Sequence, residues 1–201
     1  MSNTSLLGIP ENFAAHGGQV DHMIEVVHWF MIALFVGWTL FFFYCIFRFW
    51  HKNNPKASYV GVKSHLSSHL EIGVIIVEAV LLLGFAFPLW SDRVDNWKTV
   101  RDLDPVRVRV VGWQFGWTYH YPGADNKFGR VDPNLISGTN DLGIDYADPN
   151  ALDDFTSPIL RLPVDQAAVL NIGTKDVIHN YCIVPMRIQQ DAIPGTVAHM
   201  W

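Results

Sequence analysis

A few side chains in this sequence are of types that bind metal ions, and their spacing indicates which of them could share one ion. His179 lies in an apolar stretch, and imidazole is the commonest metal ligand among side chains. Taken alone, a histidine on a strand is more often structural. Cys182 lies three positions further on, which puts it on the opposite strand face, so we interpret it as a small core residue. His199 and Met200 are adjacent and also point apart, and Cys45 lies inside a long apolar run.

The composition narrows the class of protein. The chain has 201 residues, with 14 Lys and Arg against 19 Asp and Glu, and half of its residues are apolar. Such a chain cannot build the basic surface that nucleic acid requires. Two cysteines exclude a disulfide framework, and 13 Phe, 8 Trp and 6 Tyr exclude bulk disorder. Most charges lie in residues 91–201, so an apolar half precedes a polar, acidic half.

The apolar half predicts a two-helix transmembrane hairpin over residues 23–90. Residues 26–47 carry no formal charge, and a helix of that length spans about 33 Å, close to the thickness of a hydrocarbon core. Residues 72–90 form the second span, which Pro88 and Trp90 end at an interface. The linker Arg48–Lys63 carries basic residues and no acid, so the positive-inside rule places it in the cytoplasm. Residues 1–22 and 91–201 then lie on the opposite side.

The polar half predicts an all-β domain over residues 91–201. Valines alternate with arginines from residue 106 to 110, and aromatic residues then alternate with small or polar ones up to Pro122-Gly123, which predicts one long strand. Residues 124–158 form a long loop with seven aspartates, for which a solvated loop and a partner-docking role are about equally supported. Short apolar runs follow, at residues 159–163, 167–172, 177–184 and 186–193, as in a small sandwich.

Two motifs, together with the hairpin, resemble subunit II of haem–copper cytochrome c oxidases. They are GWQFGWTYHYPG at residues 112–123 and DVIHNYCIVPMRIQQDAIPG at residues 176–195. The resemblance covers the chain from about residue 20 to its end. It implies a cupredoxin-like Greek-key sandwich with a dinuclear copper centre, CuA, which takes electrons from cytochrome c. The electrons pass to subunit I, whose haems and CuB reduce oxygen to water with proton pumping.

The resemblance also implies a location and a set of partners. The chain would be a subunit of a bacterial inner-membrane oxidase, with both termini and the β domain in the periplasm, and it would not itself reduce oxygen. Its partners would be subunits I and III and membrane lipid. The Asp-rich insert further resembles forms found beside alternative complex III, which suggests a supercomplex with it.

Within the family pattern, His179 matches the first imidazole ligand of CuA. The family's bridging thiolates, a Cys-x3-Cys pair, its second histidine and its methionine lie beyond the DAIPG segment, whereas this sequence stops at Trp201. Either further residues supply these ligands or the protein has lost its copper. We expect the first, because about five or six strands are visible where a closed sandwich needs about seven. The GTVAHMW end would also be an apolar edge strand without a partner.

In the family, the aromatic motif contains the tryptophan that accepts electrons from cytochrome c. The entry tryptophan corresponds to Phe115 here, Trp113 replaces the family's usual histidine, and Trp117 and Tyr119 follow the pattern. Most of these rings are expected in the core. Because phenylalanine lacks the indole bridge, a tethered or fused cytochrome domain is a plausible alternative donor.

Three acids carry further expectations from the resemblance. Glu71 matches the family position at the mouth of the K proton channel of subunit I, although an interfacial acid at a helix N-terminus fits it equally well. Glu78, seven residues on, shares nearly the same helix face, and we expect that face to pack on subunit I. Asp191 is expected at the interface with subunit I, or as a plain turn residue.

Two other functions remain open from the sequence. One is a copper-free structural subunit II of a quinol oxidase, in which the sandwich only stabilises the complex. The other is a membrane-anchored cupredoxin that carries copper alone, which the acids of the second span disfavour because a lone anchor has no reason to keep acids in lipid.

Overall fold

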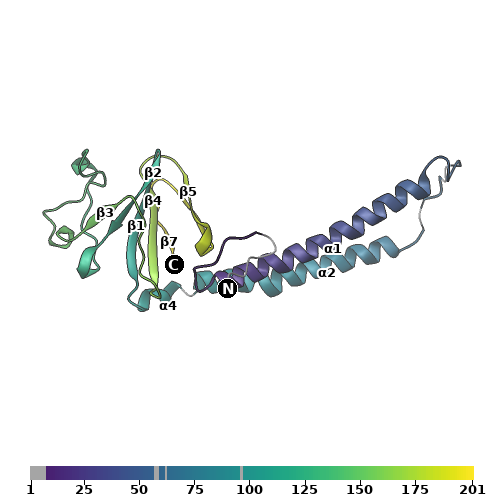
Figure 1. Cartoon of the computed structure of the whole chain (residues 1–201), viewed down its shortest axis with the longest axis horizontal. Helices are drawn as coiled ribbons and strands as arrows, with labels where there is room; N and C mark the ends of the chain where they lie inside the picture. The colour runs from purple at the N-terminus through teal and green to yellow at the C-terminus, as the bar shows by residue number, and fades with distance from the viewer. Residues whose placement is uncertain (1–7, 57–58, 62, 96) are drawn as a thin grey trace. The chain divides into compact units, whose positions relative to one another are not determined.

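The computed structural model describes residues 8–56, 59–61, 63–95 and 97–201. The chain divides into two compact units, Met1–Arg93 and Val94–Trp201. The first unit contains the long apolar helices and the second contains the β strands (Figure 1). This division confirms the predicted fold class, a helical hairpin followed by a β domain.

Two helical segments of the first unit are long and apolar enough to cross a membrane. The first is α1, Gly17–Phe49. The second begins with α2, Leu66–Leu81, and continues through the π-helical turn η1, Leu82–Ala86, into α3, Phe87–Asp95. Their most apolar windows are not buried inside the chain, whereas the core helix of a water-soluble protein would be. Both segments include the spans expected from the sequence.

The second helical segment does not stop at Pro88 and Trp90. It remains helical to Asp95, and the π-helical turn lies just before the proline. A proline inside a helix lacks the N–H that the preceding turn requires, and local π-helical adjustment lets the chain continue past it. Pro88 therefore lies within the helix, and the membrane boundary near Trp90 remains a prediction.

The second unit starts at Val94, near the end of α3, and contains the short helix α4, Trp97–Asp102, and two sheets. The first sheet has the order β3-β2-β1-β4-β7, with β1 and β4 parallel and the other pairs antiparallel. The second is the antiparallel pair β5-β6. The strands are β1 (Val106–Trp113), β2 (Gly116–Tyr121), β3 (Phe155–Ser157), β4 (Ala168–Thr174), β5 (His179–Ile183), β6 (Ile188–Ala192) and β7 (Ala198–Met200).

The stretch predicted as one long aromatic strand is a β-hairpin. β1 and β2 pair antiparallel, with Trp113 opposite Gly116 and Arg109 opposite His120, and residues 114–115 make the turn. The prediction of a single strand was wrong because the alternating pattern continues across the turn with a change of parity. The alternation itself is confirmed, since Val108 and Val110 are fully buried.

The structure also contains more strands than the sequence pattern suggested. β3 and β7 have three residues each, too short for an alternating pattern to reveal, and the hairpin adds another strand. Within the described residues the two sheets contain seven strands, more than the five or six expected from the sequence pattern. β7 does lie at a sheet edge as expected, but it pairs with β4 along its other side.

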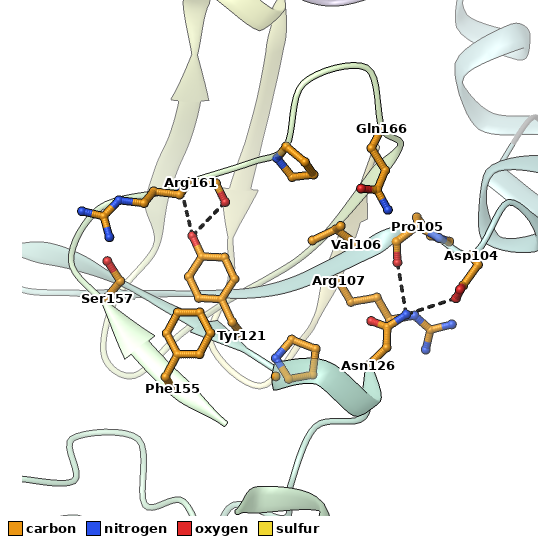
Figure 2. A pocket seen from close by; sticks show the side chains of 13 residues that line it. Asp104, Pro105, Val106, Arg107, Tyr121, Asn126, Phe155, Ser157, Arg161 and Gln166 are labelled. Atoms are coloured by element: carbon orange, nitrogen blue, oxygen red, sulfur yellow. Dashed lines mark hydrogen bonds between the residues drawn. The ribbon is translucent and has the colours of Figure 1, made fainter. Parts of the chain in front are cut away.

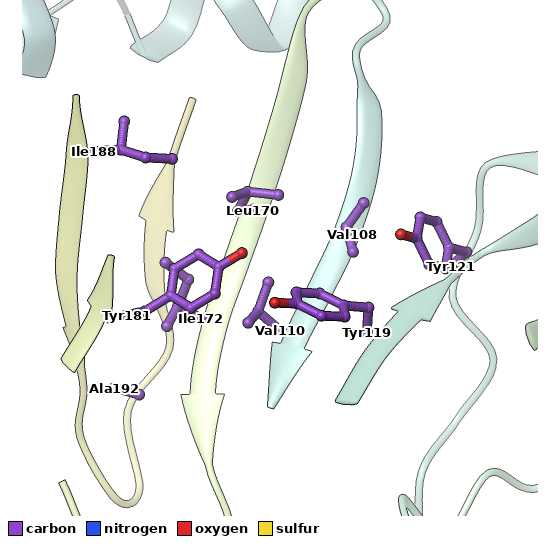
Figure 3. Packing of buried hydrophobic residues seen from close by; sticks show 9 residues of the cluster. All are labelled: Val108, Val110, Tyr119, Tyr121, Leu170, Ile172, Tyr181, Ile188 and Ala192. Atoms are coloured by element: carbon purple, nitrogen blue, oxygen red, sulfur yellow. The ribbon is translucent and has the colours of Figure 1, made fainter. Parts of the chain in front are cut away.

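The core lies between the two sheets (Figure 3). β1, β2 and β4 contribute one side of it and β5 and β6 the other, through Val108, Val110, Tyr119, Tyr121, Leu170, Ile172, Tyr181, Ile188 and Ala192. Apolar side chains alternate with polar ones along β1, so the opposite face of the large sheet presents Arg109, Thr118 and His120. A polar sheet face that is covered by protein needs internal hydrogen-bond partners.

The Asp-rich segment supplies those partners. Between β2 and β3 the chain forms three short 3-10 turns, η2 (Gly123–Asp125), η3 (Pro133–Leu135) and η4 (Pro149–Ala151). Ile144 and Ala151 are buried, and Gly129 packs so closely on Ala151 that a Cβ at residue 129 would overlap it. The segment is therefore an ordered layer with its own small core.

Candidate metal centre

His179 begins β5, and its imidazole is held by a carboxylate. Nε2 of His179 lies 2.6 Å from Oδ1 of Asp176, and their side chains are only 16% and 30% exposed. The backbone N–H groups of Gln114 and Val177 also donate to Asp176, at 2.6 and 2.7 Å. The His179 hydrogen bond, followed by these donors, holds the pKa of Asp176 well below its usual range, so the carboxylate is ionised at neutral pH.

This arrangement selects one tautomer of His179. An ionised carboxylate only accepts hydrogen bonds, so Nε2 of His179 carries the proton. In the neutral ring, Nδ1 is then the nitrogen with a free lone pair, and within the described residues it makes no hydrogen bond. Metal-binding histidines are oriented in this way, with one ring nitrogen donating to a carboxylate and the other left for the ion.

The His179 ring rests against the β1–β2 hairpin. Its centroid lies 5.7 Å from that of Trp117, with the rings edge to face at 67°. A Cβ at Gly112 would lie 3.0 Å from Cδ2 of His179 and 3.0 Å from Cζ3 of Trp117. Glycine at residue 112 is therefore what allows both rings to approach the strand.

The aromatic residues expected at the electron entry have very different surroundings. Phe115 is 88% exposed in the hairpin turn, and Trp113 is 39% exposed. The Trp113 indole N–H donates to Oγ1 of Thr118 at 3.2 Å. Trp117 is partly buried beside the core, whereas Tyr119 is buried within it. Two rings of the motif therefore lie in or against the core, and the two nearest the turn face solvent.

The other sulfur and histidine candidates do not join His179. Cys182 is exposed, so its interpretation as a core residue was wrong; the buried neighbour on that strand is Tyr181. Nδ1 of His199 donates a hydrogen bond to Oδ1 of Asn171 at 2.7 Å, and Met200 packs on the core, so the two point apart as expected. Cys45 lies in α1.

Within the described residues, no three His, Cys, Asp or Glu side chains come together as ligands. The donor chemistry of His179 therefore fits one position of a copper centre, and the described residues do not supply the thiolates of CuA.

The remaining predicted residues lie on the surface. Glu71 and Glu78 are both exposed on α2. Asp191, on β6, lies opposite Asn180 of β5 and accepts a hydrogen bond from its Nδ2 at 3.0 Å. This contact explains a local role for Asp191 in joining the two strands, and its interface role stays a prediction.

A buried polar cluster went unnoticed in the sequence. Nε2 of His120 lies 2.8 Å from Oδ2 of Asp154, and both side chains are fully buried. Arg109 approaches Nδ1 of His120 at 3.3 Å, and its guanidinium lies over the Phe128 ring. Burial, with the positive charge of Arg109, lowers the pKa of His120, although Asp154 partly offsets it. His120 is thus a neutral ring that accepts from Arg109 and donates to Asp154.

The seven aspartates of the insert are also used internally. Asp154 and Asp153 accept from backbone N–H groups of Gly129 and Ala124, and Asp141 accepts from Thr118 and Lys175. The remaining aspartates accept from backbone N–H groups within two residues or from Arg130; they are Asp125, Asp132, Asp145 and Asp148. This pattern favours a structural role over a freely solvated acidic loop.

Comparison with known proteins identifies the family. Residues 106–201 match the sequence model of the cytochrome c oxidase subunit II periplasmic domain. The chain belongs to the cytochrome c oxidase subunit II family. The match covers all seven strands, and it confirms the resemblance drawn from the two motifs.

Full-length relatives extend the similarity to the helices. The alternative cytochrome c oxidase subunit 2 of Bradyrhizobium diazoefficiens is 30% identical over 191 residues, which cover 94% of this chain and 66% of the relative. Cytochrome c oxidase subunit 2 of Cereibacter sphaeroides is 28% identical over 189 residues, covering 85% and 57%. The chain therefore spans about three fifths of the length of these two subunit II relatives.

A solved structure is also similar. The periplasmic domain of subunit II of cytochrome oxidase from Bradyrhizobium japonicum shares 23% identity, with 48% of this chain and 61% of that chain covered and a TM-score of 0.29. At that score the family assignment rests on the sequence matches.

Proposed function

We propose that this chain is the electron-transfer subunit of a bacterial terminal oxidase. In this role its β domain holds a CuA centre in the periplasm, takes electrons from cytochrome c and passes them to the haem of subunit I. The observation that carries the proposal is the geometry of His179. An ionised carboxylate fixes Nε2 and leaves Nδ1 for a metal. Membership of the subunit II family supports the same role.

His179 would hold copper through Nδ1, and Asp176 would act as a positioning residue. Bound copper would supply reversible one-electron redox chemistry. Asp176 orients the His179 ring through the hydrogen bond at Nε2. The Asp176 carboxylate is itself held by the backbone N–H groups of Gln114, in the hairpin turn, and of Val177. Trp117 packs edge to face on the His179 ring and also packs on Tyr181 of the core. A ligand held this firmly moves little when the charge of a metal changes, which favours fast electron transfer.

Electron entry would take place over the hairpin turn. Phe115 and Trp113 are exposed rings at the β1–β2 turn, and Trp117 of the same hairpin packs on the His179 ring. We propose that a donor, cytochrome c or a tethered cytochrome domain, approaches this turn. Tyr119 is too deeply buried to meet a donor and would serve as packing beneath Trp117.

The helical hairpin would anchor the β domain and contact subunit I. Glu71 and Glu78 are exposed on α2 in the isolated chain, and lipid is a costly environment for both carboxyls. We propose that their face packs on subunit I, with Glu71 at the entrance of its proton channel. Replacement of Glu78 with Leu should then impair assembly or turnover of the purified oxidase, and unchanged assembly and turnover would argue against that contact.

The copper proposal is tested on the oxidase complex purified from its native membrane. Electron paramagnetic resonance should show the mixed-valence signal of a thiolate-bridged copper pair, which copper in subunit I does not produce. The signal should be lost in His179→Asn and kept in His199→Asn, which changes an exposed histidine bound to Asn171. A signal that survives His179→Asn would refute the assignment.

A second candidate is a copper-free structural subunit II of a quinol oxidase. The lack of a three-ligand cluster within the described residues favours it. In that case the purified complex would show no mixed-valence signal and no copper beyond that of subunit I, and it would oxidise quinol directly. Intact-mass measurement of the chain in the complex, by giving its full length, shows whether further ligands exist.

A further inference from the structure

A cavity of about 460 Å³ opens at the end of the β unit where β1 begins (Figure 2). Val106 and Tyr121 lie on its walls, and Gly112, beside His179, is six residues further along β1. At about 3.3 Å per residue, the cavity is roughly 20 Å from the His179 site. Its volume is in the range of small-molecule sites, about 300–1,000 Å³. The function proposed above makes no use of it.

Two arginines line this cavity without an anionic partner. Within the described residues, the guanidinium groups of Arg107 and Arg161 make no ion pair and no hydrogen bond. Two cations of the insert or beside it do have anionic partners, since Arg130 pairs with Asp145 and Lys175 with Asp141. In an acidic domain, an unpaired and half-buried guanidinium such as that of Arg107 is costly unless something binds it.

The carboxylate in the cavity lining already accepts a hydrogen bond from another side chain. Asp104 is the single acid of the lining, and it accepts a hydrogen bond from Nδ2 of Asn126 at 3.1 Å. No ion pair joins it to Arg107. The cavity therefore carries two unneutralised positive charges against one negative charge, and an anion would complete the balance.

One wall of the cavity is an aromatic pair. The rings of Tyr121 and Phe155 stack with centroids 4.7 Å apart and planes 7° apart. Tyr121 is buried and fixed, because its hydroxyl accepts from the Arg161 backbone N–H at 2.7 Å and donates to the Arg161 carbonyl at 3.2 Å. Phe155 is 52% exposed, so the stack offers a rigid, partly open aromatic surface. Figure 2 shows the two guanidinium groups on either side of this pair.

We propose that this cavity binds a small organic anion that carries a planar ring. The ring would pack on Phe155, and a phosphate or carboxylate group would pair with Arg107 or Arg161, which suit such anions through planar, two-point hydrogen bonding. The Gln166 side chain also lines the cavity and would add a polar contact that orients the ligand. The site is separate from the His179 centre and does not depend on the redox function.

The test measures binding to the full chain in detergent micelles by isothermal titration calorimetry. Two probes separate the possible anions, adenosine 5′-monophosphate for phosphate and naphthalene-2-carboxylate for carboxylate. Adenosine and inorganic phosphate serve as the ring and the anion alone. At least one complete probe should bind with one site per chain, and at least tenfold more tightly than either half. Failure of both complete probes to bind at millimolar concentration would overturn the proposal.

Variants locate the bound probe. Arg107→Gln and Arg161→Gln together should weaken binding at least tenfold, Phe155→Leu should weaken it severalfold, and the double Arg→Lys variant, which keeps both charges, should recover part of the loss. The matched control is Arg101→Gln, an exposed arginine outside the cavity, which should change nothing. Unfolding midpoints equal to that of the native chain verify folding. Binding that persists in the double Gln variant, or that falls equally in Arg101→Gln, would refute the site.

Discussion

The imidazole of His120 and the carboxylate of Asp154 lie 2.8 Å apart, and neither side chain is accessible to solvent. His120 belongs to β2 and Asp154 to the end of the Asp-rich segment, 34 residues later. Asp154 also accepts from the Gly129 backbone N–H at 2.8 Å. This contact joins the Asp-rich segment to the polar face of the large sheet, so His120 on that face is buried.

Loss of the Asp154 carboxylate should destabilise the β unit strongly. Asp154→Ala leaves the N–H groups of His120 and Gly129 without their common acceptor and removes the anion nearest the Arg109 guanidinium, and loss of the partner of a buried charge costs about 3–5 kcal/mol. Urea unfolding of the detergent-solubilised chain, followed by circular dichroism, measures the change. Asp125→Ala is the matched control, because Asp125 is exposed and accepts only from Lys127 N–H. Equal effects of the two variants would contradict a special role for the buried pair.

The stability of the β unit should fall as the pH drops below about 6.5. Burial holds the pKa of His120 below its ordinary value, so the unfolded chain binds this proton more readily than the folded one. Stability is then complete above the unfolded pKa of about 6.5 and declines toward the depressed folded pKa, by up to about 1.4 kcal/mol per pH unit. Unfolding free energies at pH 7.5 and 5.5 give the slope.

A control separates His120 from the other histidines. His199→Gln should leave the slope unchanged, because His199 is an exposed side chain. Proton NMR of the His120 ring should show a pKa below that of an ordinary histidine. A His120 ring that is protonated at pH 7 would contradict the prediction.

Removal of the Asp176 carboxylate should allow the His179 ring to carry its proton on either nitrogen. In the native chain, nitrogen NMR should show a proton on Nε2 of His179, because Asp176 accepts there. Asp176→Asn should give a mixture of tautomers, and copper affinity in the complete centre should fall about 10–100-fold. Asp165→Asn, at an exposed position outside this contact, should behave like the native chain. A native ring that is mainly protonated on Nδ1 would refute the geometry.

A methyl group at residue 112 should displace the His179 and Trp117 rings. In Gly112→Ala, the new Cβ would lie 3.0 Å from each ring, so one of them must move, at a cost of about 1–3 kcal/mol. The near-ultraviolet circular dichroism of Trp117 should change together with the unfolding midpoint. Gly173→Ala is the control, because the nearest atom there, the Thr196 carbonyl oxygen, is 3.5 Å away. An unchanged spectrum and midpoint in Gly112→Ala would show that the rings are not packed this closely.

Local patterns in the sequence were sufficient for the coarse architecture. Two apolar runs, one without charge and one interrupted only by Glu78, predict α1 and the α2–α3 segment, because a long helix that is almost entirely apolar has few environments other than a membrane. The Val–Arg alternation from residue 106 predicts the burial of Val108 and Val110, because strand side chains alternate between faces. The motif around His179 indicates the family, which the sequence match confirms.

Only the tertiary structure decided which polar residues are buried and with whom they pair. His120 falls on the polar face of its strand, so the sequence pattern alone treats it as solvent-facing, yet the insert covers it completely. Cys182 shows the reverse, an apolar residue left exposed because its face of β5 has no covering layer within the described chain. Periodicity records which residues share a face. Whether that face meets water or protein depends on contacts between segments far apart in the sequence.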